Sequence, residues 1–276
     1  MADFWRVERS FLTPGHILYN LASNGIQGKL PSELALLRGL ETLVFDDNTF
    51  TGSFPIEFAS SLSNLTVMWF SHNALTGVLP TELGNLTLLE SIDFSGCALL
   101  GTMPTEVGLL TGLVTLFLSG NHIRGTLPTQ LGLLPFLYEM DLSGNQFTGT
   151  IPTQLGDLSE LQLLSLYQNQ LTGTIPTQLG LLINCTVMVL YYNNLHGTVP
   201  SDFSNLINMQ TMYLSGNDLT GGVETLFCGN RSSSSSRSYS IVTFETDCSP
   251  PSQIGVCGCC TSCCDPTGTI CNPTGT

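Results

Sequence analysis

A short phrase that returns at a fixed interval constrains this chain more than any other feature. The segment IPTQLG occurs at 151–156 and again at 175–180, and close variants of it run through most of the sequence. Gly and Pro interrupt long helices and long strands, so a phrase that uses both at a fixed interval marks the turns of a structural repeat. An Asn precedes each phrase. The Asn anchors are Asn24, Asn48, Asn73, Asn121, Asn145, Asn169, Asn193 and Asn217.

The anchors define a period of 24 residues. One step, between Asn48 and Asn73, is 25 residues long, and Cys97 fills the slot between Asn73 and Asn121. Apolar residues lie five and three positions before each anchor, as Leu116 and Leu118 do before Asn121. This period of two predicts a short, half-buried strand in every unit. Another apolar residue lies eight positions before the anchor, where Cys185 takes the place of Leu in one unit.

Written together, the unit is LxxLxLxxNxLxGxIPxxLGxL, which resembles the leucine-rich repeat in its plant-specific 24-residue form. The resemblance implies an α/β fold, a right-handed leucine-rich repeat solenoid. Its concave face would carry a parallel β-sheet, and its convex face a second short strand and 3₁₀ or α turns. The Asn side chains of stacked units would form a ladder that pairs with backbone groups in the bends.

The repeat divides the chain into three parts. Nine units cover 18–226, the segment 1–17 is read as a degenerate or truncated N-terminal cap, and 227–276 as a Cys-rich C-terminal cap or tail. A net charge of −14 argues against nucleic acid and against an anionic membrane surface as partners. No run of 18 apolar residues predicts a transmembrane helix, and no signal peptide is recognisable at the N-terminus.

The tail holds most of the cysteines in a segment with little apolar material. Such a segment needs covalent staples, so we expect disulfides and an extracellular or cell-surface location, with a cytoplasmic protein as the alternative. Cys228 and Cys248 are expected to pair, and a thiolate metal cluster is the less favoured reading of the remaining six. The run CGCCTSCC is similar to the ends of leucine-rich repeat proteins of diatoms and related algae. The disulfide candidates are Cys228, Cys248, Cys257, Cys259, Cys260, Cys263, Cys264 and Cys271.

Four N-x-S/T sequons mark candidate glycosylation sites, and three of them fall on repeat slots outside the expected concave strands. They are Asn64, Asn85, Asn184 and Asn230. Cys97 and Cys185 are expected to be structural residues of the core, because neither has a His partner that would activate a thiolate.

No catalytic constellation is present. The motifs GxGxxG and GxxxxGK[ST] are absent, and the four His lie in different units. Asp93 and Asp141 would lie about 10 Å apart at sheet spacing, a separation found in inverting glycosidases. On an open sheet they would lack the burial that raises one carboxyl pKa, so we reject that reading. We therefore expect no enzyme, no cofactor and no metal.

The strand residues two and four positions before each anchor would form two exposed ladders on the concave face. Aromatic residues gather toward the C-terminal half and acids toward the N-terminal half. Exposed aromatic residues often anchor ligands. The alternative is that the aromatic residues only stabilise the sheet and that the acidic residues only keep the protein soluble. The candidate ligand-binding residues are Trp69, Phe117, Tyr167, Tyr191, Tyr192, Tyr213, Asp93 and Asp141.

These features predict non-enzymatic recognition. The resemblance implies a receptor-like ectodomain whose concave face binds a protein, peptide or glycan, with a basic partner suited to the acids. The alternative is a secreted inhibitor of a cell-wall polysaccharide hydrolase, similar to polygalacturonase-inhibiting proteins. A less favoured hypothesis is ice binding, because ladders of Thr such as Thr126, Thr150 and Thr174 resemble the arrays of some ice-binding proteins, one plant type of which is itself a leucine-rich repeat protein.

Overall fold

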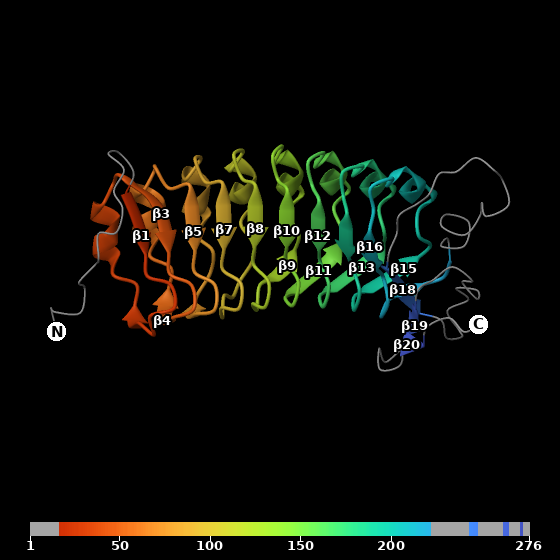
Figure 1. Cartoon of the computed structure of the whole chain (residues 1–276), viewed down its shortest axis with the longest axis horizontal. Helices are drawn as coiled ribbons and strands as arrows, with labels where there is room; N and C mark the ends of the chain where they lie inside the picture. Colours follow the sequence, from red (N-terminus) through yellow and green to blue (C-terminus); the bar gives the residue numbers. More distant parts are fainter. Residues whose placement is uncertain (1–16, 222–242, 248–261, 265–270, 273–276) are drawn as a thin grey trace.

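The expected solenoid is confirmed. The computed structural model describes residues 17–221, 243–247, 262–264 and 271–272, and the coils of the repeat follow one another along a single axis (Figure 1). Each coil contributes one strand to a long sheet on one side and a short helical turn on the opposite side. The proposed solenoid limit at 226, the N-terminal cap and most of the Cys-rich tail lie outside the described residues.

The concave side is a 12-stranded sheet whose first eleven strands pair in parallel. Equivalent residues of successive coils pair directly, so that Met140 lies between Leu116 and Leu164. This register follows from the 24-residue period, because each coil places the same slot at the same height. The strands are β1 (Ile17–Asn20), β3 (Leu40–Val44), β5 (Val67–Trp69), β7 (Ser91–Asp93), β8 (Thr115–Phe117), β10 (Glu139–Asp141), β12 (Leu163–Ser165), β14 (Val187–Val189), β16 (Thr211–Tyr213), β18 (Thr243–Asp247), β19 (Ser262–Cys264) and β20 (Cys271–Asn272).

The convex side consists of short turns, each preceded by Pro, whose φ is already fixed near the value that such a turn needs. Pro152, for example, immediately precedes its turn with φ −63°. The turns are η1 (Ser32–Leu36), α1 (Ile56–Ser61), η2 (Thr81–Asn85), η3 (Thr105–Leu109), η4 (Thr129–Leu133), η5 (Thr153–Asp157), η6 (Thr177–Leu181) and η7 (Ser201–Asn205).

The single 25-residue step of the sequence produces a single α-helical turn. In α1 the amide of Leu62 donates to the carbonyl of Phe58, four residues earlier, whereas in η5 the amide of Leu158 donates to Leu155, three residues earlier. An α-helix rises about 1.5 Å per residue and a 3₁₀-helix about 2.0 Å. The α turn therefore needs one more residue to span a similar length, and the extra residue leaves the neighbouring coils in register.

A second set of strands runs beside the turns and is interrupted. A 3-stranded and a 5-stranded parallel sheet are joined only by isolated bridges, Val78 to Leu100 and Thr102 to Arg124, in the coil that contains Cys97. The first sheet contains β2 (Gln27–Lys29), β4 (Thr49–Ser53) and β6 (Ala74–Thr76). The second contains β9 (Arg124–Thr126), β11 (Gln146–Thr150), β13 (Gln170–Thr174), β15 (Asn194–Gly197) and β17 (Asp218–Leu219).

The predicted Asn ladder is confirmed, and Asn145 illustrates it. Its side-chain Nδ2 donates to the carbonyl of Leu118 in the preceding coil (2.9 Å), and to Leu142 (3.2 Å) and Ser143 (3.1 Å) in its own. Its Oδ1 accepts from the amide of Ile123 (3.0 Å). One amide thus satisfies four backbone groups that a buried bend would otherwise leave unpaired. Cys97 replaces this set with a thiol that donates to the carbonyl of Phe70 (3.3 Å).

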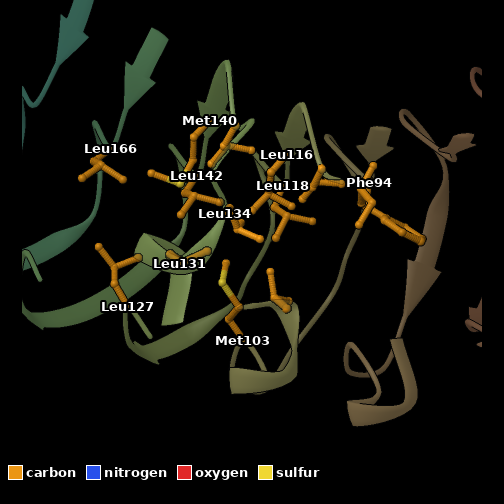
Figure 2. Close-up of a cluster of buried hydrophobic side chains, with 14 of the residues drawn as sticks. Phe94, Met103, Leu116, Leu118, Leu127, Leu131, Leu134, Met140, Leu142 and Leu166 are labelled. Carbon is orange, nitrogen blue, oxygen red and sulfur yellow. The ribbon is translucent and has the colours of Figure 1, made fainter. Parts of the chain in front are cut away.

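The core lies between the two sides and has one layer of apolar side chains per coil. Figure 2 shows the middle coils, where Leu116, Leu118, Met140 and Leu142 from the concave strands point toward the convex turns. All four are at most 1% exposed. In the first coils the same layers are aromatic: Phe45, Phe50, Phe54, Phe58, Phe70 and Phe94 form a chain of stacked and edge-on contacts.

A row of glycines sits where neighbouring turns approach each other. A Cβ added at Gly108 would lie 2.6 Å from the carbonyl oxygen of Gln130, and one at Gly180 would lie 2.6 Å from that of Asp202. Both distances are too short for non-bonded atoms, so the coils stack this closely only because these residues have no side chain. Gly84, Gly132 and Gly156 occupy the same slot and meet the same obstruction.

Candidate ligand-binding face

The concave sheet places the predicted ladders in register. Phe117 on β8 pairs with Asp93 on β7 and with Asp141 on β10, and the ladder continues through Ser165 and Val189 to Tyr213. Neighbouring strands are about 4.8 Å apart, so each side chain in a ladder is within reach of the next. The face is only partly open, because Val44, Ser165 and Val189 are buried.

Four tyrosines form a contiguous cluster at the C-terminal end of this face. Tyr167 and Tyr191 stack with ring centroids 4.6 Å apart and planes 11° apart. Tyr191 also contacts Tyr192 (5.2 Å, 69°) and Tyr213 (6.3 Å, 77°) edge-on. We call Tyr167, Tyr191, Tyr192 and Tyr213 the tyrosine cluster. Because the stacking distance matches the strand spacing, Tyr167 and Tyr191 stand side by side with their outer edges, rather than their faces, toward the concave space.

The other two aromatic candidates lie apart from the tyrosine cluster. Phe117 is on β8, two strands before β12, which leads into Tyr167. Trp69 is on β5, near the N-terminal end of the face, and its Nε1 donates to Ser91 Oγ (2.7 Å). Ser91 is in turn hydrogen bonded to Thr115 (2.6 Å). The structure therefore divides the predicted aromatic surface into a tyrosine cluster and two separate rings.

Asp93 and Asp141 have the same local geometry on the two sides of Phe117. Asp93 Oδ1 accepts from the amide of Ser95 (2.8 Å), and Asp141 Oδ1 accepts from the amide of Ser143 (3.0 Å). In each case the bond fixes the carboxylate at the edge of the strand and uses one of its two oxygens. Both residues are half-buried. The result is one phenyl ring flanked by two oriented carboxylates.

Ser143 is an unexpected member of this face. Its side chain is 1% exposed, and its Oγ has no hydrogen-bond partner. Ser95 and Ser119 occupy the equivalent slot in earlier coils and are half-buried. The next residue in that ladder is Tyr167. The sequence pattern did not single out Ser143 as a candidate. The feature that could have done so is a small polar residue beside a tyrosine in the same ladder.

Acidic side chains nearer the N-terminus form a second polar region. Asp46 Oδ1 accepts from the amide (2.7 Å) and the hydroxyl (2.9 Å) of Ser71. Partial burial raises the pKa of Asp46 above its ordinary value, the bonds from Ser71 oppose this, and the charges of Asp93 and Asp47 add to it. The carboxylates of this region therefore act on one another.

The two described cysteine side chains are core residues, as expected. Burial raises the pKa of the Cys97 thiol to about 11 and that of the Cys185 thiol to about 12. Both thiols stay protonated at neutral pH, whereas a nucleophilic cysteine needs a lowered pKa. Neither is a candidate nucleophile.

Most of the glycosylation and disulfide candidates lie away from the concave face or outside the described residues. Asn64 and Asn85 are exposed, and Asn184 is half-buried with its Nδ2 donating to the carbonyl of Ser159 (2.9 Å). Asn230 lies outside the described residues, as do Cys228, Cys248, Cys257, Cys259 and Cys260. The backbones of Cys263, Cys264 and Cys271 lie in β19 and β20. Disulfides and glycans remain predictions.

The part of the chain that the structure describes holds no group of three or more His, Cys, Asp or Glu placed to bind a metal ion. Within the same residues, no helix has both the length and the apolar character to cross a membrane.

Comparison with known proteins identifies the repeat. The model of the Leucine Rich Repeat family matches residues 64–86, 112–134, 136–158 and 160–182. Receptor-like protein 13 of Arabidopsis thaliana is 39% identical over 79 residues. This match covers 29% of the chain and 7% of that protein, so the chain spans a small fraction of the curated relative.

Two solved structures extend the similarity over most of the chain. The ectodomain of the Arabidopsis thaliana receptor kinase GASSHO1/SCHENGEN3, in complex with CASPARIAN STRIP INTEGRITY FACTOR 2, is 36% identical with a TM-score of 0.73. The match covers 75% of this chain and 25% of the GASSHO1/SCHENGEN3 chain. The ectodomain of the Arabidopsis receptor kinase HAESA, in complex with a peptide hormone, is 32% identical with a TM-score of 0.73, over 83% of this chain and 37% of its own.

Proposed function

We propose that this chain, a plant-type leucine-rich repeat protein related to receptor-like proteins and receptor kinase ectodomains, is a recognition module whose concave face binds a peptide. The two similar ectodomains named above were solved with CASPARIAN STRIP INTEGRITY FACTOR 2 and with a peptide hormone. The observation that carries the proposal is the tyrosine cluster, a connected group of large aromatic side chains on the concave face. Such residues are frequent anchors in binding sites.

The orientation of the rings favours a peptide over a glycan. A sugar ring stacks on an open aromatic face, and the faces that Tyr167 and Tyr191 turn toward each other are covered. What these two side chains present is a ridge of ring edges and hydroxyl-bearing ends. A peptide suits such a ridge, because its side chains pack against the edges while its amides pair with polar groups nearby.

The test is capture of a ligand by folded wild-type protein, made in a secretory host, from an extract of secreted peptides and proteins. The variant is Tyr167→Ala/Tyr191→Ala/Tyr213→Ala. The matched control is Tyr138→Ala, because Tyr138 is an exposed tyrosine on the segment before β10 and outside the cluster. We expect a peptide retained by wild type and by the control, and bound at least about tenfold more weakly by the triple variant.

Two other outcomes of this capture experiment would change the proposed function or its site. A captured polysaccharide hydrolase that depends on Asp93 and Asp141 would favour an inhibitor over a receptor-like module. Ligands that bind the triple variant as well as they bind wild type would remove the tyrosine cluster from the binding site.

Ice binding is a second candidate, supported by the outer face of the 5-stranded sheet. Thr126 pairs with Thr148 across β9 and β11, and Thr150 pairs with Thr172 across β11 and β13; these side chains are exposed. Each row is two threonines long, because the next strand partners are Gln170 and Asn194, so the expected ladder through Thr126, Thr150 and Thr174 is replaced by shorter pairs at strand spacing. Thermal hysteresis measured at high protein concentration tests the idea, and no depression of the freezing point would end it.

A further inference from the structure

We infer that the concave face selects peptides carrying a lysine or arginine, whose cationic group lies over Phe117 between the carboxylates of Asp93 and Asp141. The inference rests on the proposed peptide-binding function and adds the chemistry of one position of the ligand. It combines the geometry of three paired strands, the charge of the face and the unpaired hydroxyl of Ser143.

The geometry comes from the parallel register. Asp93 and Asp141 both pair with Phe117, from opposite sides, so the two carboxylates are separated by two strand spacings, about 10 Å at the backbone. A cation over the ring is attracted by its negative face and lies within reach of a carboxylate on either side. The hydrogen bonds from Ser95 and Ser143 hold both carboxylates at the strand edge before any ligand arrives.

The charge of the face requires the ligand to supply the cation. The basic residues Lys29, Arg38 and Arg124 are those that the described part of the chain contains, and none is on a strand of the concave sheet. Asp46 and Glu139 extend the acidic character along the same sheet. Charge complementarity of this kind favours basic partners and rejects acidic ones.

The Ser143 hydroxyl adds an unpaired polar group to this part of the face. It lies two residues after Asp141, it is almost completely buried, and it has no hydrogen-bond partner. An unpaired buried polar atom is costly, and native proteins contain few of them. A ligand that shifts the neighbouring Tyr167 ring and places a polar atom beside Asp141 would remove this cost.

The spacing of the coils predicts a sequence pattern in the ligand. From β8, which carries Phe117, to the coil of Tyr167 is about 10 Å, and to the coil of Tyr191 about 14 Å. An extended peptide advances about 3.3 Å per residue. A peptide lying along the sheet would therefore carry its Lys or Arg three or four residues from the side chain that packs against the tyrosine cluster.

A display library of random 12-residue peptides, selected on the folded wild-type protein, tests the inference. We expect the selected peptides to contain Lys or Arg three or four residues from an aromatic or large apolar residue. The charge variant is Asp93→Asn/Asp141→Asn. Asp157→Asn/Glu160→Gln is its control, because it removes two negative charges from exposed positions at and after η5. Selected peptides should bind the charge variant at least tenfold more weakly and the control within twofold of wild type.

The outcomes separate this inference from the proposed function. Peptides that need the tyrosines but carry no cation, and that bind the charge variant as tightly as wild type, would overturn the cation site and leave peptide binding in place. Equal weakening by the charge variant and its control would also overturn it, since net charge alone would then explain the selection. Selection of no peptide that depends on the tyrosines would overturn both. Replacing the peptide's Arg by citrulline, a neutral analogue of similar shape, should reproduce the loss.

Discussion

The two ends of the solenoid use aromatic residues on opposite sides of the same sheet. Near the N-terminus, six phenylalanines fill the core, and Phe70 stacks on Phe94 with centroids 5.1 Å apart. Near the C-terminus the core layers are mainly aliphatic, with Phe147 and Phe203 as buried exceptions, and the stacked pair is Tyr167 and Tyr191, on the concave surface at 4.6 Å. Because strand side chains alternate between faces, a shift of one residue separates these placements. The same contact geometry stabilises the fold at one end and lies on the candidate ligand-binding face at the other.

The largest effect is expected from emptying the phenylalanine layer. Phe70 is fully buried and contacts Phe45, Phe54 and Phe94. Phe70→Ala should lower the free energy of unfolding by about 3–5 kcal/mol, since it removes a large buried side chain and leaves a cavity. Urea denaturation followed by circular dichroism measures this. Phe136→Ala is the matched control, because Phe136 is 60% exposed, and a similar loss in both variants would contradict the assignment of Phe70 to a specifically packed core.

The pH dependence of stability tests whether the C-terminal core excludes water as completely as the N-terminal core. Cys185 has a pKa raised to about 12 by burial, whereas an unfolded thiol ionises near pH 8.5–9. The unfolded state therefore loses its proton first. The stability that the protonated thiol contributes is complete below that range and is lost as the pH rises toward 12. At pH 10 the free energy of unfolding should be roughly 1.5 kcal/mol lower than at pH 8 from this thiol alone.

Cys185→Ala supplies the comparison, because it lacks the titrating group while leaving the rest of the layer in place. The difference in stability between wild type and this variant, measured by urea denaturation at pH 8 and pH 10, should shrink at the higher pH. A difference that does not change with pH would mean that water reaches the thiol and that the layer is not sealed.

Removing a surface tyrosine should cost less stability than removing a core phenylalanine. Tyr191 is half-buried and makes three aromatic contacts, so Tyr191→Ala should lower the free energy of unfolding by about 1 kcal/mol. The same denaturation assay applies, with Tyr138→Ala as the control. A loss as large as that of Phe70→Ala would make the tyrosine cluster a structural element and would abolish the distinction between the two ends.

The smallest expected effect comes from completing the Asn ladder beside the phenylalanines. Cys97→Asn restores the residue type that the other coils use, and an amide there can pair with backbone groups of the preceding coil as Asn145 does. We expect the midpoint of urea denaturation to rise, by about 0.5–1 kcal/mol in free energy. Asn121→Cys is the reciprocal change and should lower it. Destabilisation by Cys97→Asn would show that the space beside Phe70 and Phe94 is too tight for an amide.

The sequence predicted the features that depend only on the position of a residue within the 24-residue repeat. The period placed the strands, the buried positions and the Asn ladder, because every coil repeats the same local solution. It also placed Cys97 and Cys185 in the core. The α-helical form of the turn at 56–61 was not predicted, although the 25-residue step was its signal.

The candidate site was less predictable, because it depends on side chains that meet across coils. Trp69, Phe117 and Tyr213 lie on concave strands as predicted, whereas the tyrosines at 167, 191 and 192 follow the ends of β12 and β14. The division of these residues into a tyrosine cluster and the separate Phe117 and Trp69 required the register of specific strands. Ser143 is more deeply buried than Ser95 and Ser119 in the same slot, a difference that the repeat pattern does not contain. A repeat pattern averages over the coils, and these features are the ways in which individual coils differ.

The glycine row on the convex side influences the shape of the candidate ligand-binding face. Gly108 and Gly180 let adjacent turns approach so closely that any side chain there would force them apart. The concave strands, held by hydrogen bonds at a fixed spacing, cannot separate to match. Bulkier residues along this row would widen the outer arc alone, and the solenoid would bend into a tighter horseshoe. The radius of the inner surface, and hence the length of peptide that the proposed site could follow, is thus set partly by residues on the opposite side of the solenoid.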